Sequence, residues 1–76
     1  MSARIDVMIA IGEELDRAYS KHGRIEWSRH EFYAILLEEV DELWDAIKLD
    51  LTEEEVKSEA LQVAAMCIRF LETRRA

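Results

Sequence analysis

Residues 28–31 read Ser-Arg-His-Glu, and this stretch marks the start of a helix. In such a capping box, the Ser28 side chain accepts a hydrogen bond from the backbone amide three residues later, and the Glu31 side chain returns to the amide of Ser28. The sequence Thr-Glu-Glu-Glu at residues 52–55 repeats the arrangement. The two boxes therefore predict one helix after the first box and another that runs from the second box to about Thr73.

A third helix is predicted ahead of the first box. Apolar side chains recur at helical spacing from Ser2 to about His22, and Gly23 then supplies the residue type that a left-handed C-cap favours. The chain has 76 residues, no Pro and two Gly, so it is too short for two domains and poor in turn-forming residues. We therefore expect one all-α domain over residues 1–76, built from three helices.

Composition limits the classes of partner that the protein can bind and the cellular compartment that we expect for it. Ten Lys and Arg against seventeen Asp and Glu give a net charge of -7, which argues against a nucleic-acid-binding surface. No apolar run approaches the roughly 18 residues of a membrane span, and a signal-peptide pattern is absent. The single cysteine, Cys67, leaves no internal disulfide. These features predict a cytoplasmic protein that binds neither nucleic acid nor membrane.

The second helix carries more apolar surface than one neighbour can cover. Its apolar side chains span an arc of roughly 140° on a helical projection. Three helices of this length also bury little surface by themselves. We therefore expect a homodimer or homotetramer whose core is a four-helix bundle, made from the second and third helices of two chains. The residues of the arc are Phe32, Tyr33, Leu36, Leu37, Val40, Leu43, Trp44 and Ile47.

Acidic residues crowd the middle of the second helix. Five of the eight residues from 38 to 45 are Asp or Glu, and none is basic. A solvated acidic face is the ordinary interpretation of such a run. Glu59 favours a different interpretation, because it projects within the apolar arc of the third helix, where an unpaired charge is costly. No basic residue is an obvious partner for it.

An antiparallel second helix would bring Glu39 and Glu42 opposite Glu59. Three converging carboxylates require positive charge, and oxygen-only ligands select Mg²⁺ or Mn²⁺ rather than zinc. Such sites usually keep coordination positions for water and for the phosphate oxygens of a substrate. The sequence therefore predicts a carboxylate site for Mg²⁺ or Mn²⁺.

The two acidic segments resemble the motif of a known superfamily. Residues 38–42 read Glu-Glu-Val-Asp-Glu, and after sixteen further residues the segment 59–62 reads Glu-Ala-Leu-Gln. This is similar to the MazG-like all-α nucleotide pyrophosphohydrolases, whose pattern is Glu-Glu-x-x-Glu followed by Glu-x-x-Asp on the next helix. The segments around Lys21, Trp27 and Arg69 also look like small MazG-like proteins of bacteria and phages. The resemblance covers most of the chain.

The resemblance implies a reaction and the residues that carry it. The superfamily hydrolyses nucleoside triphosphates, NTP or dNTP, between the α and β phosphates with the help of divalent ions, releasing a monophosphate and pyrophosphate. Glu38 matches the additional Glu that can orient water or join a second ion, and Glu38 is also the candidate to take the proton of the attacking water. Gln62 stands where the family has Asp, and its amide offers Mg²⁺ one oxygen but no charge. The residues that match metal-ligand positions are Glu39, Glu42, Glu59 and Gln62.

Substrate contacts are expected from basic and aromatic side chains. Trp27 is the candidate for base recognition, although pairing with Phe32 as a hydrophobic staple is its ordinary role. Lys21 and Arg69 are placed in the predicted site as phosphate-facing cations. They are drawn from four candidates of this kind, which are Lys21, Arg24, Lys48 and Arg69.

Two other functions are compatible with these residues. One is a degenerate MazG-like protein that binds metal or nucleotide without turnover, because Gln62 lowers the charge of the site. The other is a helical interaction module whose acidic face docks on a basic partner, and such a module would not respond to Mg²⁺. If Gln62 faces away from the ions, the glutamates alone form the site.

Overall fold

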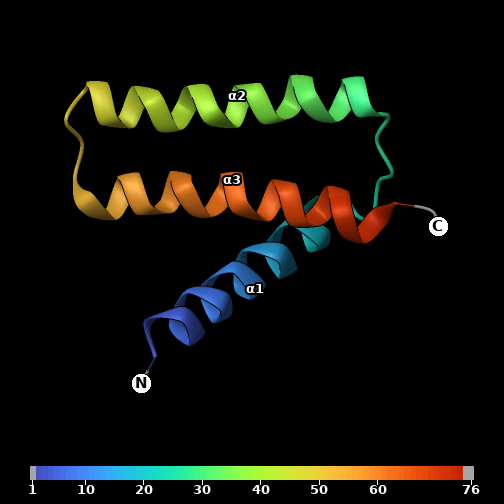
Figure 1. Cartoon of the computed structure of the whole chain (residues 1–76), viewed down its shortest axis with the longest axis horizontal. Coiled ribbons are helices and arrows are strands. Elements are labelled where there is room, and N and C mark those ends of the chain that lie inside the picture. The colour runs from blue at the N-terminus through green and yellow to red at the C-terminus, as the bar shows by residue number, and fades with distance from the viewer. Residues whose placement is uncertain (1, 75–76) are drawn as a thin grey trace.

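The computed structural model describes residues 2–74, and all regular structure within them is helical. Helix α1 spans Ala3–His22, α2 spans Arg29–Lys48 and α3 spans Glu53–Thr73. These bounds confirm the all-α class and the three predicted helices. Helices α2 and α3 lie antiparallel and side by side, and α1 crosses the C-terminal half of α3 obliquely (Figure 1).

Both predicted capping boxes are present. The Ser28 hydroxyl accepts from the Glu31 amide at 3.1 Å, and the Glu31 carboxylate accepts from the Ser28 amide at 2.9 Å. At the start of α3, the Thr52 hydroxyl accepts from the Glu55 amide at 3.2 Å, and the Glu55 carboxylate accepts from the Thr52 amide at 3.3 Å. Each box satisfies two amides that the first turn of a helix leaves unpaired, so local sequence fixes where α2 and α3 begin.

Residues with positive φ follow the first two helices. Gly23 caps α1 at the predicted position with a φ of 73°, and its amide donates to the Tyr19 carbonyl at 2.8 Å, but its ψ of -173° is extended and not that of a left-handed helical C-cap. Asp50 has a φ of 55° after α2, and the following amide of Leu51 donates to the Ala46 carbonyl at 3.0 Å. Aspartate tolerates this conformation better than most residues, which allows a tight α2–α3 connection without glycine.

The buried interior is small. Ala46, Ala65 and Met66 are 3–4% exposed, and the rings of Phe32 and Phe70 stack across α2 and α3 with their centroids 4.0 Å apart. Within residues 2–74, α1 packs on α3 and not on α2. None of the three helices described has both the length and the apolar character that a bilayer crossing requires.

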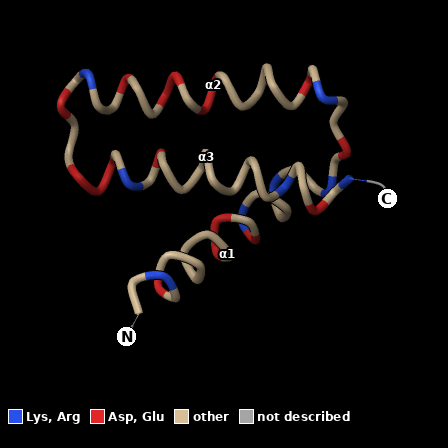
Figure 2. The backbone as a smooth tube through the Cα atoms, viewed as in Figure 1, with Lys and Arg blue, Asp and Glu red and all other residues tan. Residues whose placement is uncertain are grey.

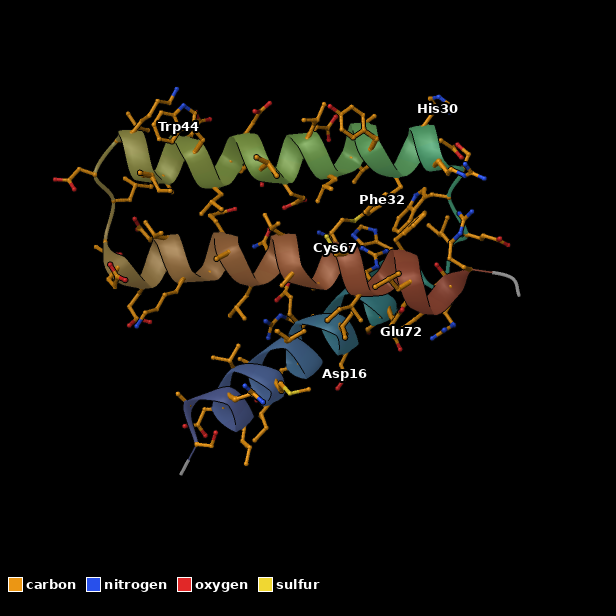
Figure 3. The ribbon with its side chains drawn as sticks, viewed as in Figure 1. Asp16, His30, Phe32, Trp44, Cys67 and Glu72 are labelled. Carbon is orange, nitrogen blue, oxygen red and sulfur yellow. The ribbon has the colours of Figure 1, made fainter. Side chains whose placement is uncertain are left out.

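Only part of the predicted apolar arc of α2 is covered. Phe32, Leu36 and Leu43 are half-buried on the side of α3. The remaining side chains form the outer α2 face, and Figure 3 shows one of them, Trp44, pointing away from α3. The arc is therefore wider than α3 alone can cover, as the helical projection predicts. The residues of the outer α2 face are Tyr33, Leu37, Val40, Trp44 and Ile47, which are 40–61% exposed.

Candidate functional site

Three glutamates of α2 and α3 converge. Glu39, Glu42 and Glu59 each offer one carboxylate oxygen, and these oxygens lie within 4.8 Å of one another. Glu39 and Glu42 are three residues apart on α2, so they share one face of that helix. The antiparallel arrangement then places Glu59 of α3 opposite them. The convergence predicted from the sequence is present, and we call these three residues the carboxylate cluster.

The carboxylate cluster is partly buried and uncompensated. Glu39 and Glu59 are half-buried, and the Oε2 atom of each is buried with no hydrogen-bond partner. Among residues 2–74, no Lys, Arg or His forms an ion pair with any member of the cluster. Buried acceptors without donors are costly for the chain alone. Carboxylate oxygens in this state fit a divalent cation that prefers oxygen ligands.

Burial and repulsion shift the titration of Glu39 and Glu59. Burial raises the pKa of Glu39, and the negative charges of Glu42, Glu59, Glu38 and Glu14 raise it further. Burial also raises the pKa of Glu59, with a smaller contribution from the charge of Glu42. Folding therefore disfavours the ionised forms of Glu39 and Glu59 unless positive charge is supplied.

The metal-free protein is expected to lose stability as the pH rises above the ordinary glutamate value of 4.5. Because folding raises the pKa of Glu39 and Glu59, their contribution to the free energy of unfolding is fully present below the unfolded-state pKa. It is lost as the pH rises through the higher folded-state values. Thermal unfolding across this window in metal-free buffer measures the effect. The double variant Glu39→Gln/Glu59→Gln should lack it, and a pH dependence like that of the parent would contradict this assignment.

A pocket of about 430 Å³ adjoins the cluster. Glu39 and Glu42 of α2 line it, and Gln62 of α3 lines it with them. Lys and Arg gather where the C-terminal ends of α1 and α3 meet, whereas acidic residues recur along α2 (Figure 2). The other lining residues are Glu14, Arg17, Ala18, Lys21 and His22 of α1, and Ala65, Met66 and Arg69 of α3.

Among the predicted phosphate-facing cations, Lys21 and Arg69 line the pocket and the other two are engaged elsewhere. The Arg24 guanidinium lies 4.8 Å from the Tyr19 ring centroid and donates to the Glu72 carbonyl at 3.4 Å. Lys48 pairs with Asp45 at 3.3 Å, at the far end of α2. The pocket lining therefore divides the four candidates into two that lie at the pocket, Lys21 and Arg69, and two that do not.

Trp27 and Glu38 lie outside the lining of the pocket. Trp27 is half-buried beneath Arg69, whose guanidinium carbon is 4.8 Å from the ring centroid. The ring of Phe32, its expected staple partner, stacks on the ring of Phe70 from α3. Glu38 is exposed and neighbours the cluster closely enough for its charge to raise the pKa of Glu39.

Of the α1 residues at the pocket, the sequence indicated only Lys21. Glu14, Arg17 and His22 also line the pocket, and Arg17 donates to the Glu14 carboxylate. Glu14, Arg17 and Lys21 recur every three to four residues, which is the signal of one helical face, and His22 follows Lys21 directly. That signal becomes informative only once the crossing of α1 over α3 is known.

No protein family, curated protein or solved structure matches this chain. The candidate site therefore stands on three features of the chain itself. They are the carboxylate cluster with its unpartnered oxygens, the pocket that adjoins it, and the cations Lys21 and Arg69 at the same pocket.

Proposed function

We propose that the protein is a MazG-like, divalent-cation-dependent nucleoside triphosphate pyrophosphohydrolase. The observation that carries the proposal is the carboxylate cluster, whose Glu39 and Glu59 oxygens are buried without donors beside a pocket that also holds Lys21 and Arg69. Negative ligands for metal and positive ligands for phosphate in one pocket are what the hydrolysis of a metal-bound polyphosphate requires.

Each side chain has a proposed task in this reaction. Glu39, Glu42 and Glu59 would hold Mg²⁺ or Mn²⁺, and Gln62 would offer an amide oxygen. A bound ion would neutralise phosphate oxygens and lower the pKa of a coordinated water. Glu38 accepts the proton of the water that attacks phosphorus, while the bond to the pyrophosphate leaving group breaks.

The positively charged side chains bind the substrate. Lys21 and Arg69 contact the phosphate oxygens and balance the charge of the departing pyrophosphate. Trp27 is still the candidate for stacking on the nucleobase of the substrate. The nucleobase would approach Trp27 past Arg69. These assignments are supported by the shared pocket of Lys21 and Arg69 and by the position of Trp27 beneath Arg69.

A panel of NTPs and dNTPs with Mg²⁺ or Mn²⁺, read out by pyrophosphate release, tests the proposed function. We expect release from at least one nucleotide and none without the divalent ion. Nucleotide-dependent stabilisation without product would instead identify a binding protein that lacks turnover. That second function is favoured by one observation, which is that a neutral Gln62 lines the pocket at the family Asp position.

Gln62→Asp is expected to tighten metal binding by about tenfold and to raise the rate of pyrophosphate release. Substitutions of residues that only hydrogen-bond to metal ligands alter metal affinity by roughly 10–100-fold. This variant acts more directly, because it adds an anionic ligand where the parent protein has only an amide dipole. Calorimetric titration with Mn²⁺ and the release assay measure the two effects. Unchanged affinity and unchanged rate would show that position 62 is not a ligand.

We also propose that the outer α2 face mediates self-association into a dimer or tetramer with a four-helix-bundle core. Five exposed apolar side chains on one helix form a patch of the kind that marks interaction surfaces. The proposal also accounts for the small interior of the single chain. A helical interaction module with another partner is the alternative for this surface.

The double variant Leu37→Glu/Trp44→Glu is expected to shift the mass measured by light scattering from that of the oligomer to the 8.9 kDa of one chain. Two charges buried at a close-packed interface are not compensated, so association should fail. Met8→Glu is the matched control, because Met8 is 64% exposed on α1, away from the outer α2 face. A parent protein that is monomeric at micromolar concentration would contradict the assembly.

A further inference from the structure

One basic side chain of the pocket is buried without a counter-charge. Arg69 is 9% exposed, and its Nε atom is buried with no hydrogen-bond partner. Among residues 2–74, no carboxylate forms an ion pair with its guanidinium, although Glu39 and Glu42 line the same pocket. A buried cation without a partner is costly, and an oxyanion from outside the chain would supply the missing acceptor.

Two aromatic rings hold the guanidinium of Arg69. Its central carbon lies 4.8 Å from the Trp27 ring centroid and 5.8 Å from that of Tyr19. These cation–π contacts stabilise the charge, but a ring face does not replace a hydrogen-bond acceptor in the guanidinium plane. No acceptor among residues 2–74 therefore occupies the side-chain N–H donors of Arg69, and Arg69 lines the pocket.

The residues that carry these rings are hydrogen-bonded to the C-terminal end of α3. Arg74 donates to the Trp27 backbone carbonyl at 2.7 Å, and the Tyr19 hydroxyl donates to the Glu72 carboxylate at 3.4 Å. Arg24, whose guanidinium lies over the Tyr19 ring, donates to the Glu72 carbonyl at 3.4 Å. These contacts hold the Trp27 backbone and the Tyr19 side chain beside Arg69, and a preorganised guanidinium would lower the entropic cost of binding.

We propose that Arg69 is the centre of an oxyanion subsite, which binds one phosphate group of a phosphorylated ligand without a metal ion. The planar fork of the guanidinium matches two phosphate oxygens. Lys21 lines the same pocket and makes no ion pair within the described chain, so it adds a second positive charge. Arg17 contributes less, because Glu14 neutralises it.

The pocket thus has an acidic pole at Glu39 and Glu42 and a basic pole at Lys21 and Arg69. A ligand with phosphate at two positions can bridge them, with one group on the ion and another on the guanidinium. The choice of phosphate as the oxyanion rests on the proposed function. The basic pole should nevertheless bind phosphate when the acidic pole is empty, and this sets the subsite apart from the metal centre.

Inorganic pyrophosphate, titrated into metal-free protein, tests the subsite. In the Trp44→Phe variant Trp27 is the only tryptophan, and it lies against Arg69, so its fluorescence reports binding there. We expect a saturable change in emission. Arg69→Gln and Arg69→Lys in this background should each weaken pyrophosphate affinity by about tenfold or more, because they lose charge-assisted hydrogen bonds.

Lys57→Gln is the matched control, since it removes one positive charge from α3 at a residue outside this pocket. It should keep the affinity of the parent. Malonate, a dicarboxylate, should bind more weakly than pyrophosphate, and tighter binding would overturn phosphate as the ligand. The subsite is also overturned if Trp27 emission does not change, or if Arg69→Gln binds as the parent does. If circular dichroism shows that the Arg69 variants are unfolded, Lys21→Gln is used in their place. An unchanged pyrophosphate affinity in Lys21→Gln then overturns the subsite.

The same proteins separate this inference from the proposed function. The Arg69 variants should keep the stabilisation that Mg²⁺ gives, because none of their substitutions touches the carboxylate cluster. Pyrophosphate binding without any nucleotide hydrolysis would support the subsite and overturn the proposed function. Hydrolysis without metal-free pyrophosphate binding would overturn the subsite alone.

Discussion

Glu59→Gln is expected to abolish the rise in melting temperature that Mg²⁺ or Mn²⁺ gives the parent protein. An ion at 100 times its Kd that binds only the folded state adds about 2.7 kcal/mol. For a domain of this size that corresponds to a rise of roughly 11–22 °C. The substitution removes one of three converging ligands, and no other carboxylate among the described residues joins the cluster.

The same variant should leave the metal-free protein as stable as the parent or more stable at neutral pH. Glu59 is half-buried with an unpartnered oxygen, so the neutral amide removes a repulsive charge. Differential scanning calorimetry with and without Mn²⁺ measures both effects. Glu54→Gln, which removes an exposed charge from the first turn of the same helix, should keep the full metal response. A full response in Glu59→Gln would exclude this residue from the metal centre.

Glu39→Gln is expected to lower the rate of pyrophosphate release by about 100-fold or more. Glu39 lies in both the carboxylate cluster and the pocket, so it links the ion to the space that the substrate would occupy. Removing one preorganised electrostatic group from a reaction centre costs about 10²–10³ in rate, and a ligand that holds the ion should cost at least as much.

Single-turnover assays at saturating Mn²⁺ distinguish lost metal affinity from lost chemistry in this variant. Asp41→Asn is the control, because Asp41 is exposed on α2 and lies outside the cluster. It should retain the parent rate. A Glu39→Gln protein that releases pyrophosphate at the parent rate would remove Glu39 from the reaction.

Local chemistry explains why the fold was largely predictable. The beginnings of α2 and α3 depend on Ser28 and Thr52, whose hydrogen bonds reach only three residues along the chain. The end of α1 depends on the conformation of Gly23. The carboxylate cluster was predictable for a similar reason, because Glu39 and Glu42 share a helical face and a short connection imposes the antiparallel neighbour.

The surroundings of Arg69 show what the sequence could not specify. The sequence indicated Arg69 as one of four candidate phosphate-facing cations. The burial of its side chain beside Tyr19 and Trp27 depends on how α1 crosses α3. A helical projection gives the face of a helix and not its crossing angle. For that reason Glu14 and Arg17 were not foreseen at the pocket, nor was the contact of Arg69 with the Trp27 ring.

Because α1 contacts α3 and not α2, we expect two units of local unfolding within the described residues. The exposed apolar residues at the start of α1, among them Val7 and Met8, contribute little to its docking, so α1 should detach at a lower free energy than the α2–α3 hairpin. Detachment would carry away Tyr19 and Lys21 and leave Glu39, Glu42 and Glu59 in place. The proposed binding of an ion would then survive a fluctuation that abolishes the proposed binding of phosphate, so the two binding events would report on different cooperative units of one small chain.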